Sequence, residues 1–134
     1  MNFLKLKSIM KKLIVITCFL LSGIGLANAQ QTSPIWPGCE NSEDIKKCFN
    51  QKLSKHVSKN YEYPKNDAGE YIRGKVTLSF DINENGEIVV NSIEGKEPEV
   101  NKAAREMIKK IPEMEPGTLN GEADSRTFTV PFNF

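Results

Sequence analysis

The sequence predicts an α+β fold, a two-layer sandwich in which two helices cover one face of a three-stranded sheet. Apolar residues recur at three- and four-residue spacing over roughly 43–59 and 98–111, which is typical of amphipathic helices. They alternate with polar residues over 75–82 and 126–134, which is typical of strands with one buried face, and residues 87–93 are predicted to be a further strand. The elements therefore follow the order helix, strand, strand, helix, strand.

The first predicted helix begins near Asn41 and Ser42, which are N-cap candidates. Glu43 and Asp44 suit its first turn, because the helix dipole favours carboxylates there. The predicted apolar stripe consists of Ile45, Cys48, Phe49, Leu53 and Val57, with Lys52 and His56 beside them.

The second predicted helix opens with Pro98, which suits the first helical position because no backbone donor is needed there. Pro112 ends this helix. Its predicted buried stripe is Val100, Ala103, Ala104, Met107, Ile108 and Ile111. Before the first strand, residues 60–74 form a connector with a turn at 67–69 and a close backbone approach at Gly74.

A hairpin joins the first two strands. The pair Asn85-Gly86 is the strongest short hairpin signal, so residues 87–93 return antiparallel to residues 75–82. The run from Ile88 to Val90 is apolar on both faces, which leaves the register of the second strand open and is compatible with a β-bulge.

The last strand is predicted to lie at an edge of the sheet, because Pro131 cannot donate a ladder hydrogen bond. A right-handed crossover through the second helix then places the first strand in the centre, which gives the order 2-1-3. The free backbone groups of such an edge can pair with an extended peptide. Many edges bind nothing, so the edge alone leaves docking open. The residues proposed to bind a partner are Arg126, Thr127, Phe128, Thr129, Val130, Pro131 and Phe132.

Residues 1–29 are predicted to be a secretory signal peptide, cleaved between Ala29 and Gln30. Four lysines precede an apolar run, Leu13 to Leu26, that is short for a bilayer crossing of about 20 residues. An uncleaved anchor is the alternative. Cleavage would reduce the 18 basic residues to 14 against 17 acidic ones, so the mature chain would be acidic. This balance argues against nucleic-acid binding.

After cleavage the chain would keep two cysteines, Cys39 and Cys48. In an oxidising compartment the expected arrangement is one disulfide that staples the turn and first helix of residues 30–60. A redox pair usually has the spacing Cys-x-x-Cys, and a metal would need more ligands than these cysteines and the lone His56 supply.

No set of residues suggests catalysis, a metal or a cofactor. His56 lies beside the apolar helix stripe without a visible catalytic partner, and Glu84 and Glu87 flank an exposed turn. Arg73 and Arg126 could steer an acidic peptide or could be solvated surface charges. The aromatic residues Trp36, Tyr61, Tyr63 and Tyr71 either cap the core or line a ligand patch. The sequence therefore predicts a binding protein without an enzymatic activity or a small-molecule substrate.

Residues 61–134 resemble the C-terminal domain of the TonB energy-transducer family. The segments that carry the resemblance, in order, are Tyr63-Pro64, Ile72–Ile82, Asn85–Ile88, Asn101–Arg105, Ile111-Pro112, Glu115–Gly117, Asn120-Gly121 and Val130–Phe132. Upstream, Pro34–Cys39 and Lys46–Phe49 resemble a subgroup with a two-cysteine prefix.

The resemblance implies a periplasmic domain whose last strand pairs with an extended segment in the plug of an outer-membrane transporter. Contact with the membrane would then run only through partners, and strand-exchanged dimers are compatible with the family. The sequence lacks the family's long Pro/Lys/Glu-rich spacer, and a cleaved signal would leave no anchor. An interaction module that keeps the fold without transducing energy is therefore the alternative.

Overall fold

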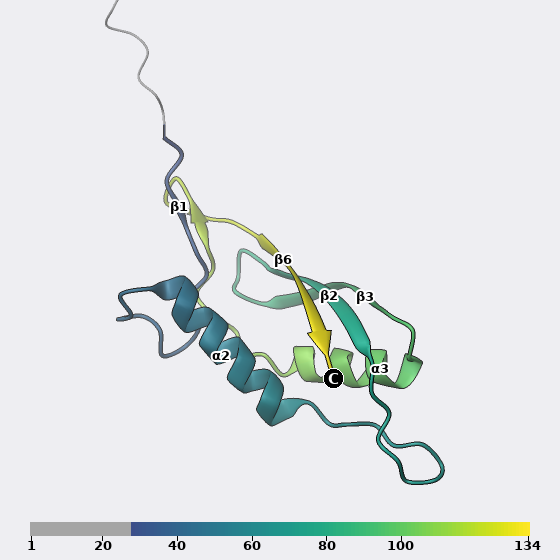
Figure 1. Cartoon of the computed structure of the whole chain (residues 1–134). Coiled ribbons are helices and arrows are strands. Elements are labelled where there is room, and N and C mark those ends of the chain that lie inside the picture. Colours follow the sequence, from purple (N-terminus) through teal and green to yellow (C-terminus); the bar gives the residue numbers. More distant parts are fainter. Residues whose placement is uncertain (1–27) are drawn as a thin grey trace, which may run out of the picture.

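The computed structural model describes residues 28–134, so the predicted signal peptide lies outside the described residues except for its last two positions. No helix among these residues has the length and apolar character needed to cross a membrane. Residues 28–134 form two helices and two three-stranded antiparallel sheets (Figure 1). The elements are β1 (Gln31–Thr32), α2 (Ile45–Asn60), β2 (Lys75–Ile82), β3 (Ile88–Gly95), α3 (Pro98–Lys109), β4 (Thr118–Leu119), β5 (Glu122–Ala123) and β6 (Arg126–Asn133).

The main sheet has the order β3-β2-β6, which confirms the predicted order 2-1-3. β2 is the central strand and pairs antiparallel with both neighbours. β6 therefore lies at an edge, where the prediction from Pro131 placed it. The β2–β6 register is regular along its whole length, with Phe80 opposite Phe128.

The β2–β3 hairpin has a three-residue loop between Asn83 and Glu87, and Gly86 adopts a positive φ of 77°. The register that the sequence left open contains a β-bulge, one residue after the apolar run 88–90: the pairing shifts between Ser79 and Phe80, which leaves Asn91 without an opposite residue. The Asn91 amide donates a hydrogen bond of 2.8 Å to the Asp81 carboxylate and so holds the bulge in place.

The caps of the two helices differ. The carboxylate of Asp44 accepts a hydrogen bond of 3.0 Å from the Lys47 backbone N–H, so Asp44 is the N-cap of α2. The prediction of Asn41 or Ser42 as the cap was therefore wrong by two residues or more. α3 begins at Pro98, as predicted.

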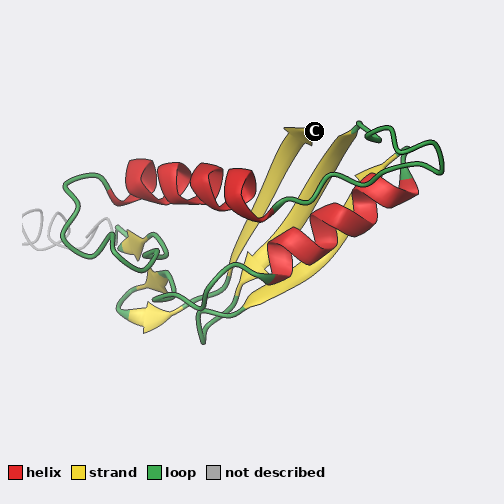
Figure 2. Ribbon diagram, turned by 90° about the horizontal axis from the view of Figure 1, so that it is seen from below, coloured by secondary structure: helices red, strands yellow, loops and turns green. Residues whose placement is uncertain are grey.

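The core lies between the central strand and the helices. Val76, Leu78, Phe80 and Ile82 of β2 are at most 2% exposed. They face Val100, Ala104, Met107 and Ile108 of α3, each 0% exposed, and α3 runs across β2 and β3 (Figure 2). Full burial of one such large side chain contributes about 1.5–3 kcal/mol, so this layer is the main source of stability.

The small sheet β1-β4-β5 was not predicted from the sequence. The residues expected to form a loop with two turns contain β4 and β5, which form a hairpin through Asn120 and Gly121, with φ angles of 52° and 83°. β1 pairs with β4 and brings residues 31–32 against residues 118–119. Strands of two residues have no periodicity that could be detected.

The predicted disulfide is present between Cys39 and Cys48, whose Cα atoms lie 5.9 Å apart. Cys39 is 0% exposed and follows the turn that contains Trp36. The bond joins this turn to the first part of α2 and thereby fixes where the helix begins relative to the preceding chain.

Candidate functional site

The open side of β6 is the candidate site. Just beyond the paired strands, the Gly74 N–H donates to the Phe134 carbonyl at 3.2 Å, and the Phe134 N–H donates to the Gly74 carbonyl at 2.9 Å. In an antiparallel ladder such pairs alternate with pairs whose backbone groups point outward. The even-numbered residues of β6 therefore bond to β2, and the outward groups belong to the odd-numbered residues Thr127, Thr129, Pro131 and Asn133.

This alternation gives the edge a defined pattern of donors and acceptors. Thr127, Thr129 and Asn133 each present an N–H and a carbonyl, whereas Pro131 presents a carbonyl alone. The backbone nitrogen of Pro131, which carries no hydrogen, faces outward. Proline at this position therefore removes no hydrogen bond from the β2–β6 ladder. No other backbone segment of residues 28–134 bonds to these groups. An extended peptide could therefore pair along the whole strand, with one hydrogen bond fewer at Pro131.

Stacked rings hold β6 in position. Phe128 stacks on Phe80 of β2 at 5.6 Å between ring centroids and on Phe49 of α2 at 5.1 Å. Beyond the other end of the strand, Phe134 stacks on Tyr61 at 3.6 Å. Such contacts anchor both ends of the edge, so a partner would meet a strand that is already ordered.

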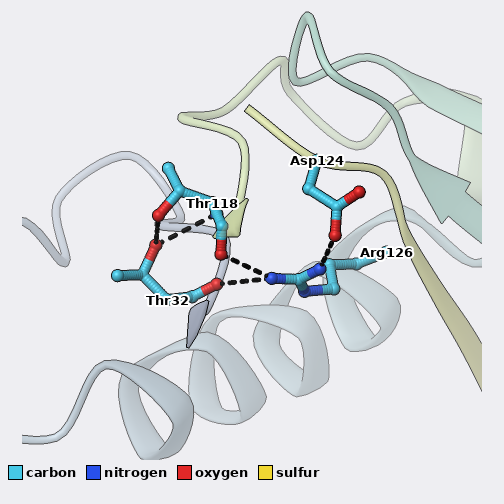
Figure 3. Close-up of polar contacts among 4 residues, drawn as sticks. All are labelled: Thr32, Thr118, Asp124 and Arg126. Carbon is cyan, nitrogen blue, oxygen red and sulfur yellow. Dashed lines mark hydrogen bonds and ion pairs between the residues drawn. The ribbon is translucent and has the colours of Figure 1, made fainter. Parts of the chain in front are cut away.

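The side chain of Arg126 is committed to the fold. It forms an ion pair with Asp124 and donates to the carbonyls of Thr32 and Thr118 at 3.2 and 2.8 Å (Figure 3). Only 15% of this side chain is exposed. Its backbone pairs with Ile82. Arg126 therefore ties the small sheet to the start of β6 and is not a free charge at the edge.

Of the other residues considered as possible site residues in the sequence, some lie in the core and others on the surface. The His56 ring lies 3.0 Å from the Met107 carbonyl and tilts against Trp36, so it joins α2 to α3. Tyr61 is buried, and its burial raises the pKa of its hydroxyl. Tyr63 and Tyr71 are 43% and 58% exposed.

The two exposed tyrosines carry cations on their rings, Arg73 on Tyr63 and Lys65 on Tyr71. They form a small surface beyond the end of the sheet. At the opposite end, Glu84 and Glu87 are exposed, and a carboxylate oxygen of Glu87 accepts from the Asn83 side chain at 3.2 Å. Within residues 28–134, no three His, Cys, Asp or Glu side chains are grouped to hold a metal ion.

A pocket that the sequence did not predict lies beside β6. Its volume is about 170 Å³, and its walls come from three separate segments, residues 33–34, α2 and β6. The apolar walls are Pro34, Phe49 and Phe128, and the polar rim is Ser33, Lys46 and Asn50. Its formation depends on the placement of α2 beside the edge strand, which no local pattern encodes.

In both views α2 lies on the side of β6 away from β2 (Figures 1 and 2). Its rings reach β6 through Phe49, but no Cα atom of α2 lies within 8 Å of a Cα atom of β6. A further strand would stand about 4.8 Å from β6. Beside the helix, the odd-numbered residues Thr127, Thr129, Pro131 and Asn133 of β6 are exposed.

The fold is an α+β domain whose last strand, β6, lies at an edge of the main sheet. Comparison with known families gives the family described as Gram-negative bacterial TonB protein C-terminal, which matches residues 59–134. The chain belongs to this family, as the resemblance in the sequence predicted. It is a family of periplasmic, non-enzymatic interaction domains. Comparisons with curated proteins and with solved structures gave no match.

Proposed function

We propose that this protein is a periplasmic binding domain whose β6 edge pairs with an extended segment of an outer-membrane TonB-dependent transporter. The observation that carries the proposal is the open edge itself: a regular strand, anchored at both ends, with an outward row of backbone groups that no other described segment covers. Membership of the TonB C-terminal family supports the choice of partner.

The energetics limit what the backbone contributes to binding. Each added ladder hydrogen bond contributes about 0.5–1.5 kcal/mol net. Ordering each residue of a flexible peptide costs about 1–2 kcal/mol. Backbone pairing alone is therefore close to neutral. Side-chain contacts or tethering of the partner must supply the affinity, so free peptides should bind weakly.

Proline substitution tests the role of the edge. Thr129 points its N–H outward, so Thr129→Pro removes a docking donor and leaves every β2–β6 hydrogen bond in place. We expect this variant to fold and to lose most of its affinity for transporter plug peptides. The reverse change, Pro131→Thr, adds an outward donor and should strengthen binding.

The measurement is NMR titration of the ¹⁵N-labelled protein with synthetic plug peptides at millimolar concentration. The amide signals of Thr127, Thr129 and Asn133 should shift most, because their N–H groups would enter the new ladder. If peptides bind Thr129→Pro as well as the unchanged protein, or shift only signals far from β6, the edge is not the binding site. If no plug peptide binds while another envelope protein does, the domain is an interaction module for that partner instead.

A further inference from the structure

The small sheet holds the chain from the residue that directly follows the predicted cleavage site. The Gln30 backbone N–H donates to the side-chain oxygen Oδ1 of Asn120 at 3.1 Å, and the Gln30 carbonyl accepts from the Asn120 backbone N–H at 2.7 Å. β1 then continues the pairing with β4. The two residues before it, Asn28 and Ala29, are exposed and make no hydrogen bond to another described residue. The contacts of this end of the domain therefore begin at Gln30.

The turn between β4 and β5 directs Asn120 toward this contact. Among the described residues, Asn120 is the one residue other than glycine with a positive φ, which is 52°. Asparagine adopts this left-handed conformation at a lower cost than most residues. Both its backbone N–H and its side-chain oxygen reach Gln30, so the side chain supplies the acceptor that a longer partner strand would otherwise supply. β1 therefore needs no residue before Gln30.

The docked segment also supports the start of β6. The carbonyls of Thr32 and Thr118 accept from the Arg126 guanidinium at 3.2 and 2.8 Å (Figure 3). The hydroxyls of the two threonines lie 2.7 Å apart and fix the register of β1 against β4. A chain end that stays docked at Gln30 therefore keeps Thr32 on the arginine with which β6 begins.

Cleavage between Ala29 and Gln30 would convert the Gln30 nitrogen from an amide into an amine. The amine nitrogen of an N-terminal glutamine can attack the Cδ atom of its own side chain. The bond between Cδ and Nε2 then breaks, and ammonia leaves with a proton taken from the amine. The product is a lactam, pyroglutamate, and no oxidant or further reactant is needed. Gln30 is exposed, so no packing holds its side chain away from its own nitrogen.

The lactam matches the contact that the structure shows. Its nitrogen carries one hydrogen and no charge, as the Gln30 nitrogen does within the uncleaved chain. It can therefore donate to Asn120 Oδ1, and the Gln30 carbonyl, which the reaction leaves unchanged, still accepts from the Asn120 N–H. The ring also fixes the torsion about the N–Cα bond, so the closed end loses less conformational freedom when it docks.

Resting on the predicted signal cleavage, we infer that the mature chain begins with a pyroglutamate at position 30 that is docked on Asn120. The modified end completes the small sheet without any preceding residue. It also lacks the α-amine that aminopeptidases recognise, so β1 and its contact with Arg126 are protected from trimming.

The first test uses the full chain, including residues 1–29, produced in a Gram-negative bacterium and recovered from the periplasm. Its intact mass, measured directly after extraction, should equal that of residues 30–134 with the disulfide, less the mass of one ammonia. The matched control is Gln30→Asn, whose shorter side chain would have to close a smaller and strained ring. This variant should keep its ammonia and a free N-terminus. An unprocessed chain, a start at another residue or an unmodified Gln30 would refute the inference.

A ¹⁵N–¹H NMR spectrum of the recovered protein tests the docking. The lactam N–H gives an amide signal, whereas the hydrogens of a free ammonium exchange with water too fast to be observed. Asn120→Gly removes the side-chain acceptor and keeps the left-handed turn. The lactam N–H should then exchange about threefold to tenfold faster, which is the factor that one net hydrogen bond supplies.

The matched control for docking is Asn85→Gly, the same substitution in the other Asn-Gly pair. The Asn85 side chain is exposed in the loop between β2 and β3, so this change should leave the exchange of the lactam N–H unaltered. Equal exchange in Asn120→Gly and Asn85→Gly would refute the docked end even where the mass shows the lactam.

Discussion

Gly86 is the position where a single methyl group should do the most damage. Its φ is 77°, in the left-handed region that residues with a side chain adopt at a cost. A Cβ atom placed on Gly86 would lie 1.6 Å from the Met114 carbonyl oxygen. The Met114 N–H also donates to the Gly86 carbonyl at 3.0 Å, so the two backbones are in direct contact.

The expected cost of Gly86→Ala has three parts. A left-handed conformation costs an alanine about 1–2 kcal/mol. Overpacking against a backbone atom, which cannot rotate away, costs about 1–3 kcal/mol. Separation of the two backbones would lose the Met114 hydrogen bond, worth about 0.5–1.5 kcal/mol. The free energy of unfolding should therefore fall by about 2.5–6.5 kcal/mol, a large share of the ~5–15 kcal/mol typical of a small domain.

Gly69→Ala is the matched control. Gly69 has a similar φ of 80°, but no heavy atom lies within 4 Å of the position that a Cβ atom would take there. This variant should lose only the conformational part, about 1–2 kcal/mol. Urea unfolding followed by the fluorescence of the buried Trp36 would give both values. Equal losses in the two variants would refute the argument that the hairpin is held by direct contact with Met114.

Three further changes test other parts of the structure. Replacing Cys39 and Cys48 by serine opens a ten-residue loop and should lower the free energy of unfolding by about 2.5–3 kcal/mol; an unchanged urea midpoint would contradict this. The pKa of Glu40 is lowered from 4.5 by hydrogen bonds from its own backbone N–H and that of Gly38, so its stabilising contribution is present above pH 4.5 and is lost as pH falls below it. In thermal melts, Glu40→Gln should therefore reduce the loss of stability that occurs as pH falls below 4.5. Burial raises the pKa of Tyr61 above 10.0, and its hydroxyl has no partner within residues 28–134. The Tyr61→Phe variant should therefore be as stable as the unchanged protein at pH 7, and it should lack the loss of stability that ionisation of Tyr61 causes above pH 10. If the variant is markedly less stable at pH 7, the hydroxyl accepts or donates a hydrogen bond in the folded protein.

Much of the main sheet was predictable because its signals are local. Alternation of apolar residues identified β2 and β6, the Asn85-Gly86 pair identified the hairpin, and Pro131 placed the last strand at an edge. Each of these features is a property of a few neighbouring residues. The N-cap of α2 was misplaced because several candidate residues stand together and only the geometry of Asp44 separates them.

The sequence predicted which strand forms the candidate site, but not which backbone groups of that strand face outward. The sequence proposed seven consecutive residues, but the register with β2 decides that Thr127 and Thr129 present backbone groups and that Phe128 does not. A change of register by one residue would exchange the two sets. Asn133 was missed for the same reason, and Arg126 proved to be a structural tie rather than a free charge.

The sequence by itself determined the class of fold, the central and edge strands and the family, because period, turn residues and proline act over short stretches of chain. The tertiary structure alone decided which amides face outward, where α2 stands beside β6, and that Pro34, Phe49 and Phe128 enclose one pocket. These depend on contacts between segments up to about 90 residues apart along the chain, and packing rather than local preference selects such contacts.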